Sequence, residues 1–222
     1  MAEYTPEDNK LALKVVFYGP ALSGKTTNLM QLHSLLNPER KGELMVLETR
    51  DDRTLFFDML PIGLKSESGL DLRLKLYTVP GQVQHDSTRK AVLSRADGVV
   101  FVADSQPSQQ DNNANAFGNL EENLEKVGLD IDTLPLVVQF NKRDIPGVVD
   151  EAELQDRWSA TPWSPLVMAS ALRGSGVIAT FRLLLDRLYT EVDAEFELAA
   201  RHGIDRNRFI TRLSASDEVD LA

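Results

Sequence analysis

The segment GPALSGKT at residues 19–26 has the residue types and the spacing of a loop that holds phosphate groups. Its glycines let backbone N–H groups turn toward an anion, Lys25 can reach the outer phosphates of a nucleotide, and the hydroxyl of Thr26 can ligate Mg²⁺. An apolar segment precedes the loop and a helical pattern follows it, which disfavours a simple glycine-rich surface turn. The candidate nucleotide-binding residues here are Gly19, Ala21, Leu22, Ser23, Gly24, Lys25, Thr26 and Thr27.

A second motif, NKRD at residues 141–144, indicates which base is bound. The carboxylate of Asp144 can accept hydrogen bonds from guanine N1–H and from the exocyclic amine, whereas adenine presents the wrong pattern. Lys142 can pack its stem along the base, and Asn141 can brace the loop. The backbone of the SAL segment, residues Ser170, Ala171 and Leu172, can offer an N–H group to guanine O6. We therefore expect GTP or GDP with Mg²⁺, and an ATP-dependent kinase is disfavoured.

The elements that must position these motifs alternate between strand and helix patterns. Strand patterns occupy residues 13–19, 70–77, 98–105, 134–141 and 166–170, and helical patterns occupy residues 26–37, 114–127 and 177–199. This alternation predicts an α/β fold with a mostly parallel sheet of six or seven strands and helices on both faces. In such sheets ligands bind at the carboxyl ends of the strands, where most of these motifs lie.

The chain is expected to contain one domain over residues 10–191. The last helical pattern keeps one register from Val177 to Ala199, before Arg201, His202 and Gly203 provide a stop. Residues 192–222 are expected to extend this helix and then to form a mobile acidic tail.

Composition disfavours several classes of partner. The 222 residues carry a net charge of −10, which repels nucleic acid and anionic lipid, and they include no cysteine. The N-terminal residues lack the pattern of a leader peptide, and neither Ala2 nor the final residues match a lipidation signal. We expect a cytoplasmic protein that is monomeric alone, with no lipid anchor.

Five segments, GPALSGKTTNL, RDDRTLFFDMLP, TVPGQ, GVVFVADSQ and NKRDIP, together resemble the MglA-like family of bacterial Ras-like small GTPases. The resemblance covers about residues 10–190. It implies a Ras-like P-loop GTPase domain that hydrolyses GTP to GDP and controls cell polarity or gliding motility, with recruitment to a cell pole as one option. It also implies a roadblock-fold, MglB-like activator and effectors that bind the GTP form.

The resemblance implies further site residues in two loops. Gln82 would orient the attacking water, Thr54 would contact the γ-phosphate and Mg²⁺, and Gly81 would donate its N–H to the γ-phosphate. Arg53 would act as an internal arginine finger that a partner moves into place. The competing interpretation of Arg53 is a solvated loop charge beside two aspartates.

Two positions depart from the usual Ras-like pattern. Thr78 stands where most Ras-like proteins carry the Asp that binds Mg²⁺ through water, and the resemblance implies that Asp58 takes over this role. The alternative is that Asp58 faces solvent. Ala21 replaces a glycine beside the γ-phosphate and is expected to slow hydrolysis. These departures keep open an alternative function, a GTP-loaded binding module or scaffold with weak hydrolysis.

Overall fold

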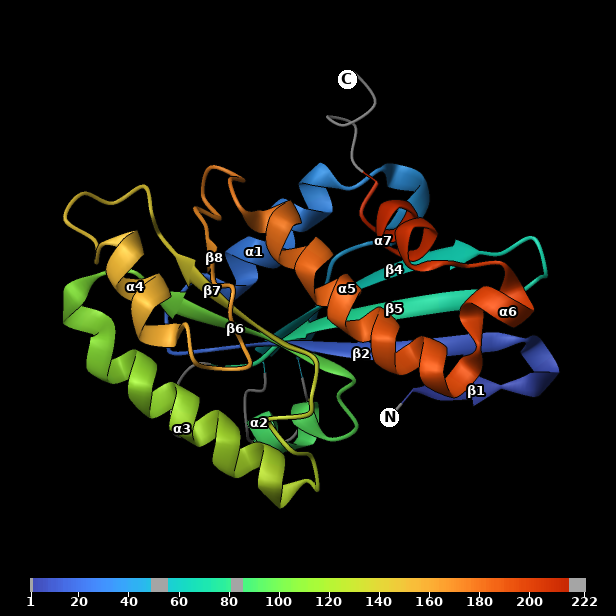
Figure 1. Cartoon of the computed structure of the whole chain (residues 1–222), viewed down its shortest axis with the longest axis horizontal. Helices are drawn as coiled ribbons and strands as arrows, with labels where there is room; N and C mark the ends of the chain where they lie inside the picture. The colour runs from blue at the N-terminus through green and yellow to red at the C-terminus, as the bar shows by residue number, and fades with distance from the viewer. Residues whose placement is uncertain (1, 49–55, 81–85, 216–222) are drawn as a thin grey trace.

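The computed structural model describes residues 2–48, 56–80 and 86–215, which build one eight-stranded β-sheet with helices on both faces (Figure 1). The strands are β1 (Glu3–Thr5), β2 (Lys10–Tyr18), β3 (Met45–Glu48), β4 (Phe56–Lys65), β5 (Asp71–Thr78), β6 (Gly98–Asp104), β7 (Leu136–Asn141) and β8 (Val167–Met168). The helices are α1 (Lys25–Leu35), α2 (Asp86–Leu93), α3 (Gln110–Lys126), α4 (Glu151–Trp158), α5 (Val177–Phe196), α6 (Leu198–His202) and α7 (Arg206–Leu213).

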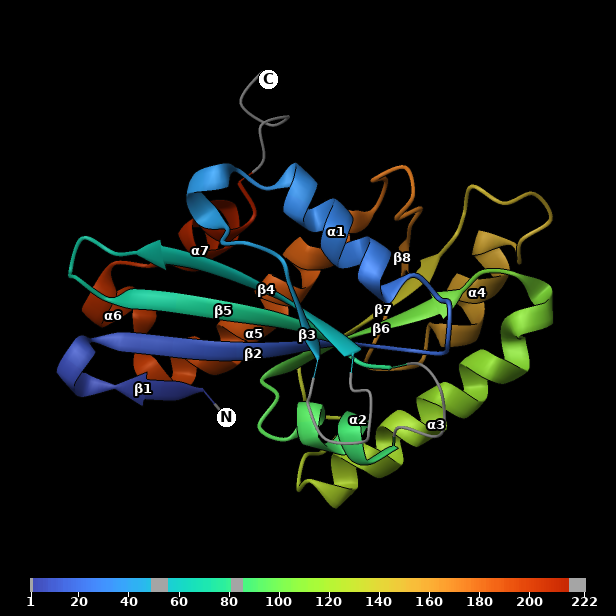
Figure 2. The same ribbon diagram turned by 180° about the vertical axis from the view of Figure 1, so that it is seen from behind.

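The sheet order is β3-β4-β5-β2-β6-β7-β8, and β1 pairs with the first half of β2 (Figure 2). The neighbouring pairs β5–β2, β2–β6, β6–β7 and β7–β8 are parallel. The pairs β3–β4, β4–β5 and β1–β2 are antiparallel. The predicted α/β class with a mostly parallel sheet is therefore confirmed. The sheet has eight strands, whereas the sequence predicts six or seven. Strands β1, β3 and β4 lie outside the five strand patterns of the sequence, and the three residues of β1 are too few to show a periodicity.

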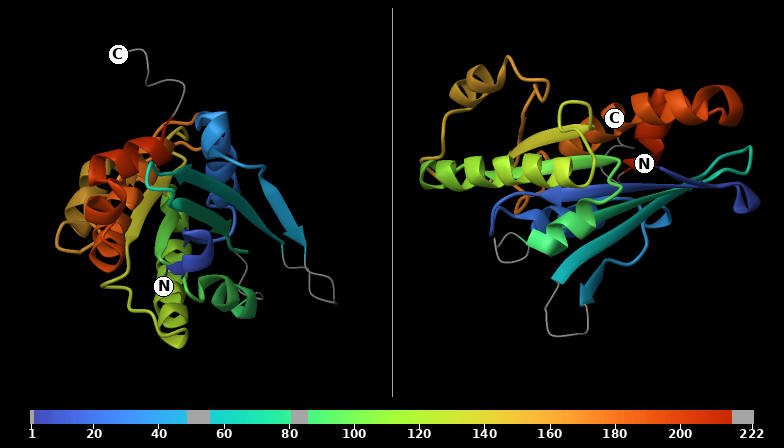
Figure 3. Two further views of the ribbon diagram at one scale, coloured as in Figure 1. Left: turned by 90° about the vertical axis from the view of Figure 1, so that its right-hand side faces the viewer. Right: turned by 90° about the horizontal axis from the view of Figure 1, so that it is seen from below.

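Each face of the sheet buries its own apolar cluster. Helices α1, α5, α6 and α7 cover one face, and α2, α3 and α4 cover the other (Figure 3). Strand β5 illustrates the alternation, since Leu72, Leu74 and Leu76 are fully buried while Arg73 and Lys75 between them are exposed. Among the described helices, none is long and apolar enough to cross a membrane.

The single long C-terminal helix predicted from the sequence is interrupted. Helix α5 ends at Phe196, and Glu197 adopts a left-handed conformation with φ 52° and ψ 46°. A left-handed residue at this point ends a helix by redirecting the chain, and α6 then begins at Leu198. Helical periodicity does not reveal such a break, because the apolar residues before and after it pack into the same core.

Residues beyond the break also pack into this core. Ile204, Phe209 and Leu213 belong to the buried cluster that α5 and the sheet share, and the ring of Phe209 lies 5.5 Å from that of Tyr189. The predicted extension of the last helix is therefore replaced by two short helices that fold back over the sheet (Figure 1). The expected mobile tail falls mostly on residues 216–222, outside the described residues.

Candidate functional site

The loop over residues 19–26 joins β2 to α1 at the carboxyl edge of the sheet, as the sequence predicts. At both of its glycines, Gly19 and Gly24, a side chain would clash with neighbouring atoms. A Cβ on Gly19 would lie 2.2 Å from the Val102 carbonyl oxygen, and one on Gly24 would lie 2.3 Å from Asn141 Nδ2. Both glycines also have positive φ angles, 142° and 98°. The loop therefore depends on glycine for its shape and for its close contact with neighbouring strands.

Ala21 and Leu22, which lie between these glycines, differ in backbone conformation. Leu22 is left-handed, with a φ angle of 62°, and its side chain is 87% exposed. Ala21 is not among the described residues with positive φ, so its methyl group fits its backbone. Any effect of Ala21 on hydrolysis must therefore come from what its methyl group contacts, not from backbone strain.

Lys25 is a buried cation at the base of this loop. Its side chain is 7% exposed, and Nζ donates to the carbonyl oxygens of Gly19, at 3.1 Å, and Pro20, at 2.7 Å. Burial, and to a smaller extent the nearby positive charge of Arg89, together lower the pKa of Lys25 to about 8. Carbonyl oxygens do not neutralise the ammonium charge, so an anion in the loop would supply the missing counter-charge.

Three oxygen-bearing side chains meet beside the loop. Thr26 Oγ1 donates to Asp58 Oδ2 at 2.6 Å, and Thr78 Oγ1 donates to the same oxygen at 3.0 Å. The backbone N–H of Asp58 in turn donates to Thr78 Oγ1 at 2.9 Å. Asp58 is 8% exposed and Thr78 3%, so Asp58 does not face solvent as the alternative interpretation required. Antiparallel pairing of β4 with β5 brings the two residues together.

These oxygens have the chemistry that Mg²⁺ prefers, since Mg²⁺ takes oxygen ligands and keeps several waters. They line a cavity of about 340 Å³ together with the loop residues Leu22, Gly24, Lys25 and Thr27. No group of three or more His, Asp or Glu side chains suited to a metal occurs in the part of the chain that the structure describes. A metal here would therefore rely on hydroxyls, phosphate oxygens and waters as well as on Asp58.

Asn141 connects the phosphate loop to the segments predicted to bind the base. Its Nδ2 donates to the Ser23 carbonyl oxygen at 2.8 Å, and its Oδ1 accepts from the backbone N–H of Ala171 at 2.8 Å. Residues 19–26, 141–144 and 170–172 are thus joined, although they lie far apart in the sequence. Of the SAL residues, Leu172 remains 75% exposed.

Asp144 has the state required of a guanine acceptor. Ser170 Oγ donates to Asp144 Oδ1 at 2.5 Å, and this hydrogen bond is the main reason why the pKa of Asp144 lies below its usual value. Its carboxylate therefore stays ionised and can accept from donors of a base. The neighbouring Lys142 is left-handed, with a φ angle of 68°.

Two charged residues near the site were not predicted from the sequence. Arg89 on α2 is 3% exposed, close to Lys25, and its Nη1 donates to Tyr18 Oη at 3.4 Å. Asp104 at the end of β6 is 4% exposed and forms an ion pair with Lys142. The GVVFVADSQ segment contains Asp104, but nothing in its spacing points to Lys142, which lies 38 residues further along the chain.

Four predicted site residues, Arg53, Thr54, Gly81 and Gln82, lie outside the described residues. Their roles in hydrolysis stay predictions. The other predicted site residues all lie in segments around the phosphate loop, the cavity beside it and the NKRD loop.

Comparison with known proteins agrees with this geometry. Residues 5–188 match the ADP-ribosylation factor family. The chain is also similar to the mutual gliding-motility protein MglA of Myxococcus xanthus (strain DK1622), with 44% identity over 179 residues. This similarity covers 81% of the chain and 91% of the Myxococcus protein. The match to the family spans every segment that forms the site.

Proposed function

Because the chain belongs to the ADP-ribosylation factor family, as an MglA-like small GTPase, we propose that it is a molecular switch that controls cell polarity or gliding motility. It binds GTP, hydrolyses it slowly to GDP, and binds partners in the GTP state. The observation that carries this proposal is the double hydrogen bond of Asn141, which ties the phosphate loop to the base-binding segments at a fixed spacing. That arrangement suits a guanine nucleotide lying across both.

The residues around the phosphates have separable roles in this proposal. Lys25 would neutralise the outer phosphates, Thr26 would ligate Mg²⁺, and Asp58 and Thr78 would hold a water bound to it. The chemistry that Mg²⁺ would supply there is positive charge that offsets the charge of the phosphates. The buried position of Asp58, 2.6 Å from Thr26, supports its assignment as the acid that substitutes for the missing Asp at position 78.

Hydrolysis itself is assigned to four residues on the basis of the family. Gln82 orients the attacking water, Gly81 donates to the γ-phosphate, and Thr54 contacts both the γ-phosphate and the metal. Arg53 stabilises the charge that develops on the transferred phosphoryl group. A roadblock-fold, MglB-like activator repositions Arg53 and Gln82, in the cytoplasm of a bacterium or at its pole.

The experiment that tests this proposal is single-turnover GTP hydrolysis by the purified protein with Mg²⁺, alone and with a roadblock-fold partner. We expect slow hydrolysis alone and acceleration by the partner. Arg53→Ala should bind GTP normally but lose hydrolysis in the presence of the partner by about 10³–10⁵-fold. Arg201→Ala, which removes an exposed arginine on α6, serves as the matched control and should behave as wild type.

The outcomes separate the two classes of function. Protein that binds GTP but never hydrolyses it, even with the partner, would be the binding module or scaffold. Protein that binds neither GTP nor GDP would contradict both functions.

A further inference from the structure

We propose that Asp104 is a positioning residue that holds Lys142 in place for the guanine base and so sets how long the nucleotide stays bound. This inference rests on the proposed function, because it assigns a role within the same guanine nucleotide site. It also gives a role to the VADSQ segment, which lies outside the phosphate loop and the NKRD motif.

The contact between the two side chains is short and shielded from water. Lys142 Nζ donates to Asp104 Oδ2 at 2.6 Å, and the two side chains are 26% and 4% exposed. A buried carboxylate is costly unless it is paired and hydrogen-bonded, so Asp104 has a strong preference for this cation. The pair therefore differs from the exposed ion pairs on the surface of this protein, such as Arg157–Glu153.

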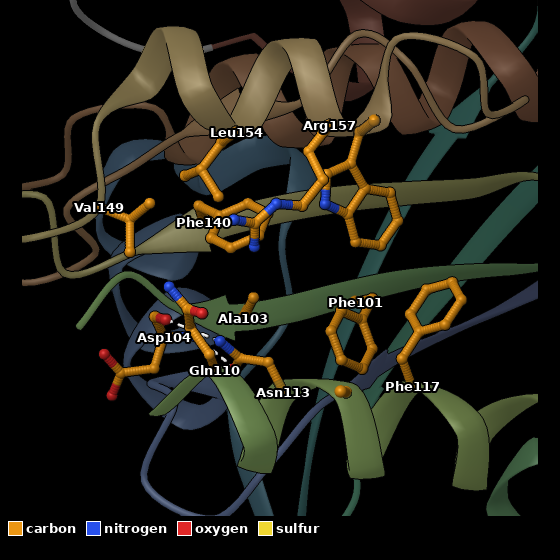
Figure 4. A pocket seen from close by; sticks show the side chains of 12 residues that line it. Phe101, Ala103, Asp104, Gln110, Asn113, Phe117, Phe140, Val149, Leu154 and Arg157 are labelled. Atoms are coloured by element: carbon orange, nitrogen blue, oxygen red, sulfur yellow. Dashed lines mark hydrogen bonds between the residues drawn. The ribbon is translucent and has the colours of Figure 1, made fainter. Parts of the chain in front are cut away.

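Asp104 is itself held rigidly by two neighbours. Gln106 donates to its carboxylate from the backbone N–H, at 3.0 Å, and from Nε2, at 3.1 Å and 3.2 Å to the two oxygens. Asn113 on α3 accepts from the Asp104 backbone N–H at 2.9 Å and donates to its carbonyl oxygen at 2.8 Å (Figure 4). Contacts within the protein thus fix both the backbone and the side chain of Asp104.

The cation that Asp104 holds is the one predicted to pack along the base. A lysine side chain has many rotamers and loses this freedom when a ligand fixes it. If the ion pair with Asp104 already fixes the rotamer of Lys142, nucleotide binding does not incur that loss of entropy. The backbone of Lys142 is also predetermined, by its left-handed φ angle of 68° and by the hydrogen bonds of Asn141 before it.

The decisive experiment is a double-mutant cycle on the rate of release of a fluorescent GDP analogue in excess GDP and Mg²⁺. The proteins are wild type, Asp104→Asn, Lys142→Met and the double variant. We expect Asp104→Asn to speed release by about tenfold. This factor corresponds to the side-chain entropy that is lost when one lysine is held in a single rotamer. In the Lys142→Met background the same substitution should have little further effect, because the group that it positions is already gone.

Two further variants test whether the change in the rate of GDP release is specific to the carboxylate of Asp104. Asp111→Asn removes an exposed carboxylate from the first turn of α3, with the same change in net charge, and should release GDP like wild type. Asp104→Glu keeps the charge but displaces it by one methylene, so its release rate should lie between those of wild type and Asp104→Asn. The unfolding temperature of each variant with saturating GDP shows that folded protein is compared.

The results that overturn the inference are distinct from those that overturn the proposed function. If Asp104→Asn speeds release equally with and without Lys142, or does not speed it at all, Asp104 does not act through Lys142. If wild type fails to bind the GDP analogue, the proposed function fails and this inference fails with it.

Discussion

At the scale of single residues, one buried carboxylate beside the phosphate loop accepts hydrogen bonds from two hydroxyl groups. Asp58 Oδ2 accepts from both Thr26 and Thr78, so the negative charge missing at position 78 is present one strand away. A neutral threonine could orient a water but could not offset the charge of a metal ion. We therefore propose that Asp58 supplies this charge.

Replacing this carboxylate by its neutral isostere is the direct test. We expect Mg²⁺ to slow the release of GDP, and in Asp58→Asn this slowing should be smaller by a factor of about ten or more. The reason is that hydrogen bonds to charged groups are stronger than those between neutral groups. The measurement is the rate of GDP release as the free Mg²⁺ concentration is varied. Asp132→Asn, at an exposed acid in the loop between α3 and β7, is the control. An identical Mg²⁺ dependence in Asp58→Asn and wild type would exclude Asp58 from the metal site.

At the scale of elements, the start of α2 is attached to α3 by a polar cluster. Asp86 Oδ1 accepts from Asn123 Nδ2 at 2.8 Å and from Asn119 Nδ2 at 3.4 Å. Asn123 Nδ2 also donates to Tyr18 Oη, next to the phosphate loop, at 3.3 Å. The hydrogen bond from Asn123 is the main reason why the pKa of Asp86 falls from 3.8 to about 2. The cluster thus links α2 to α3 and to β2.

This pKa predicts how stability depends on pH. A carboxyl group whose pKa is lowered on folding stabilises the protein above its unfolded pKa of 3.8, and this contribution is lost as the pH falls through about 2. Asp86→Asn should therefore lower the Tm by about 2–4 °C at neutral pH, and the difference should vanish between about pH 4 and pH 2. Thermal unfolding across this range measures it, with Glu121→Gln on the exposed side of α3 as the control. A difference that persists at pH 2 would mean that the Asp86 charge is not its source.

At the scale of the whole molecule, the C-terminal helices belong to the same core as the GTPase sheet. Phe209 is fully buried, and the hydroxyl of Tyr189 on α5 donates to the Ile204 carbonyl oxygen at 3.1 Å. Arg208 further pairs with Glu67 in the β4–β5 turn at 2.5 Å. The segment after α5 is therefore bound to the strand that carries Asp58, although at the opposite end of that strand.

Removing the central side chain of this contact should destabilise the entire fold. Phe209→Ala should lower the free energy of unfolding by about 3–5 kcal/mol, the range for a large aromatic residue deleted from a core. Urea denaturation at a fixed GDP concentration is the measurement. Asn207→Ala, two residues earlier on the exposed face of α7, should change it little. If Phe209→Ala changed the free energy of unfolding as little as Asn207→Ala, the packing of α7 would add no stability to the domain.

The sequence alone was sufficient for the α/β class, the phosphate loop and the guanine motif. Each of these motifs consists of neighbouring residues in one loop, so their spacing along the chain directly reflects their spacing in space. Strand and helix periodicity then places both loops at the carboxyl edge of a parallel sheet. Lys25, Asn141 and Asp144 are therefore predicted from their motifs alone to bind the nucleotide.

Only the tertiary structure decided which distant residues meet. The hydrogen bond between Thr26 and Asp58, residues 32 positions apart, requires the pairing of β4 with β5 and the placement of α1 beside them. The ion pair of Asp104 with Lys142 requires β6 and β7 to lie in parallel register, and the left-handed turn at Glu197 requires a core for α7 to cover. Register and packing arise from the balance of many contacts over the whole chain, whereas a motif reflects only the few residues within it.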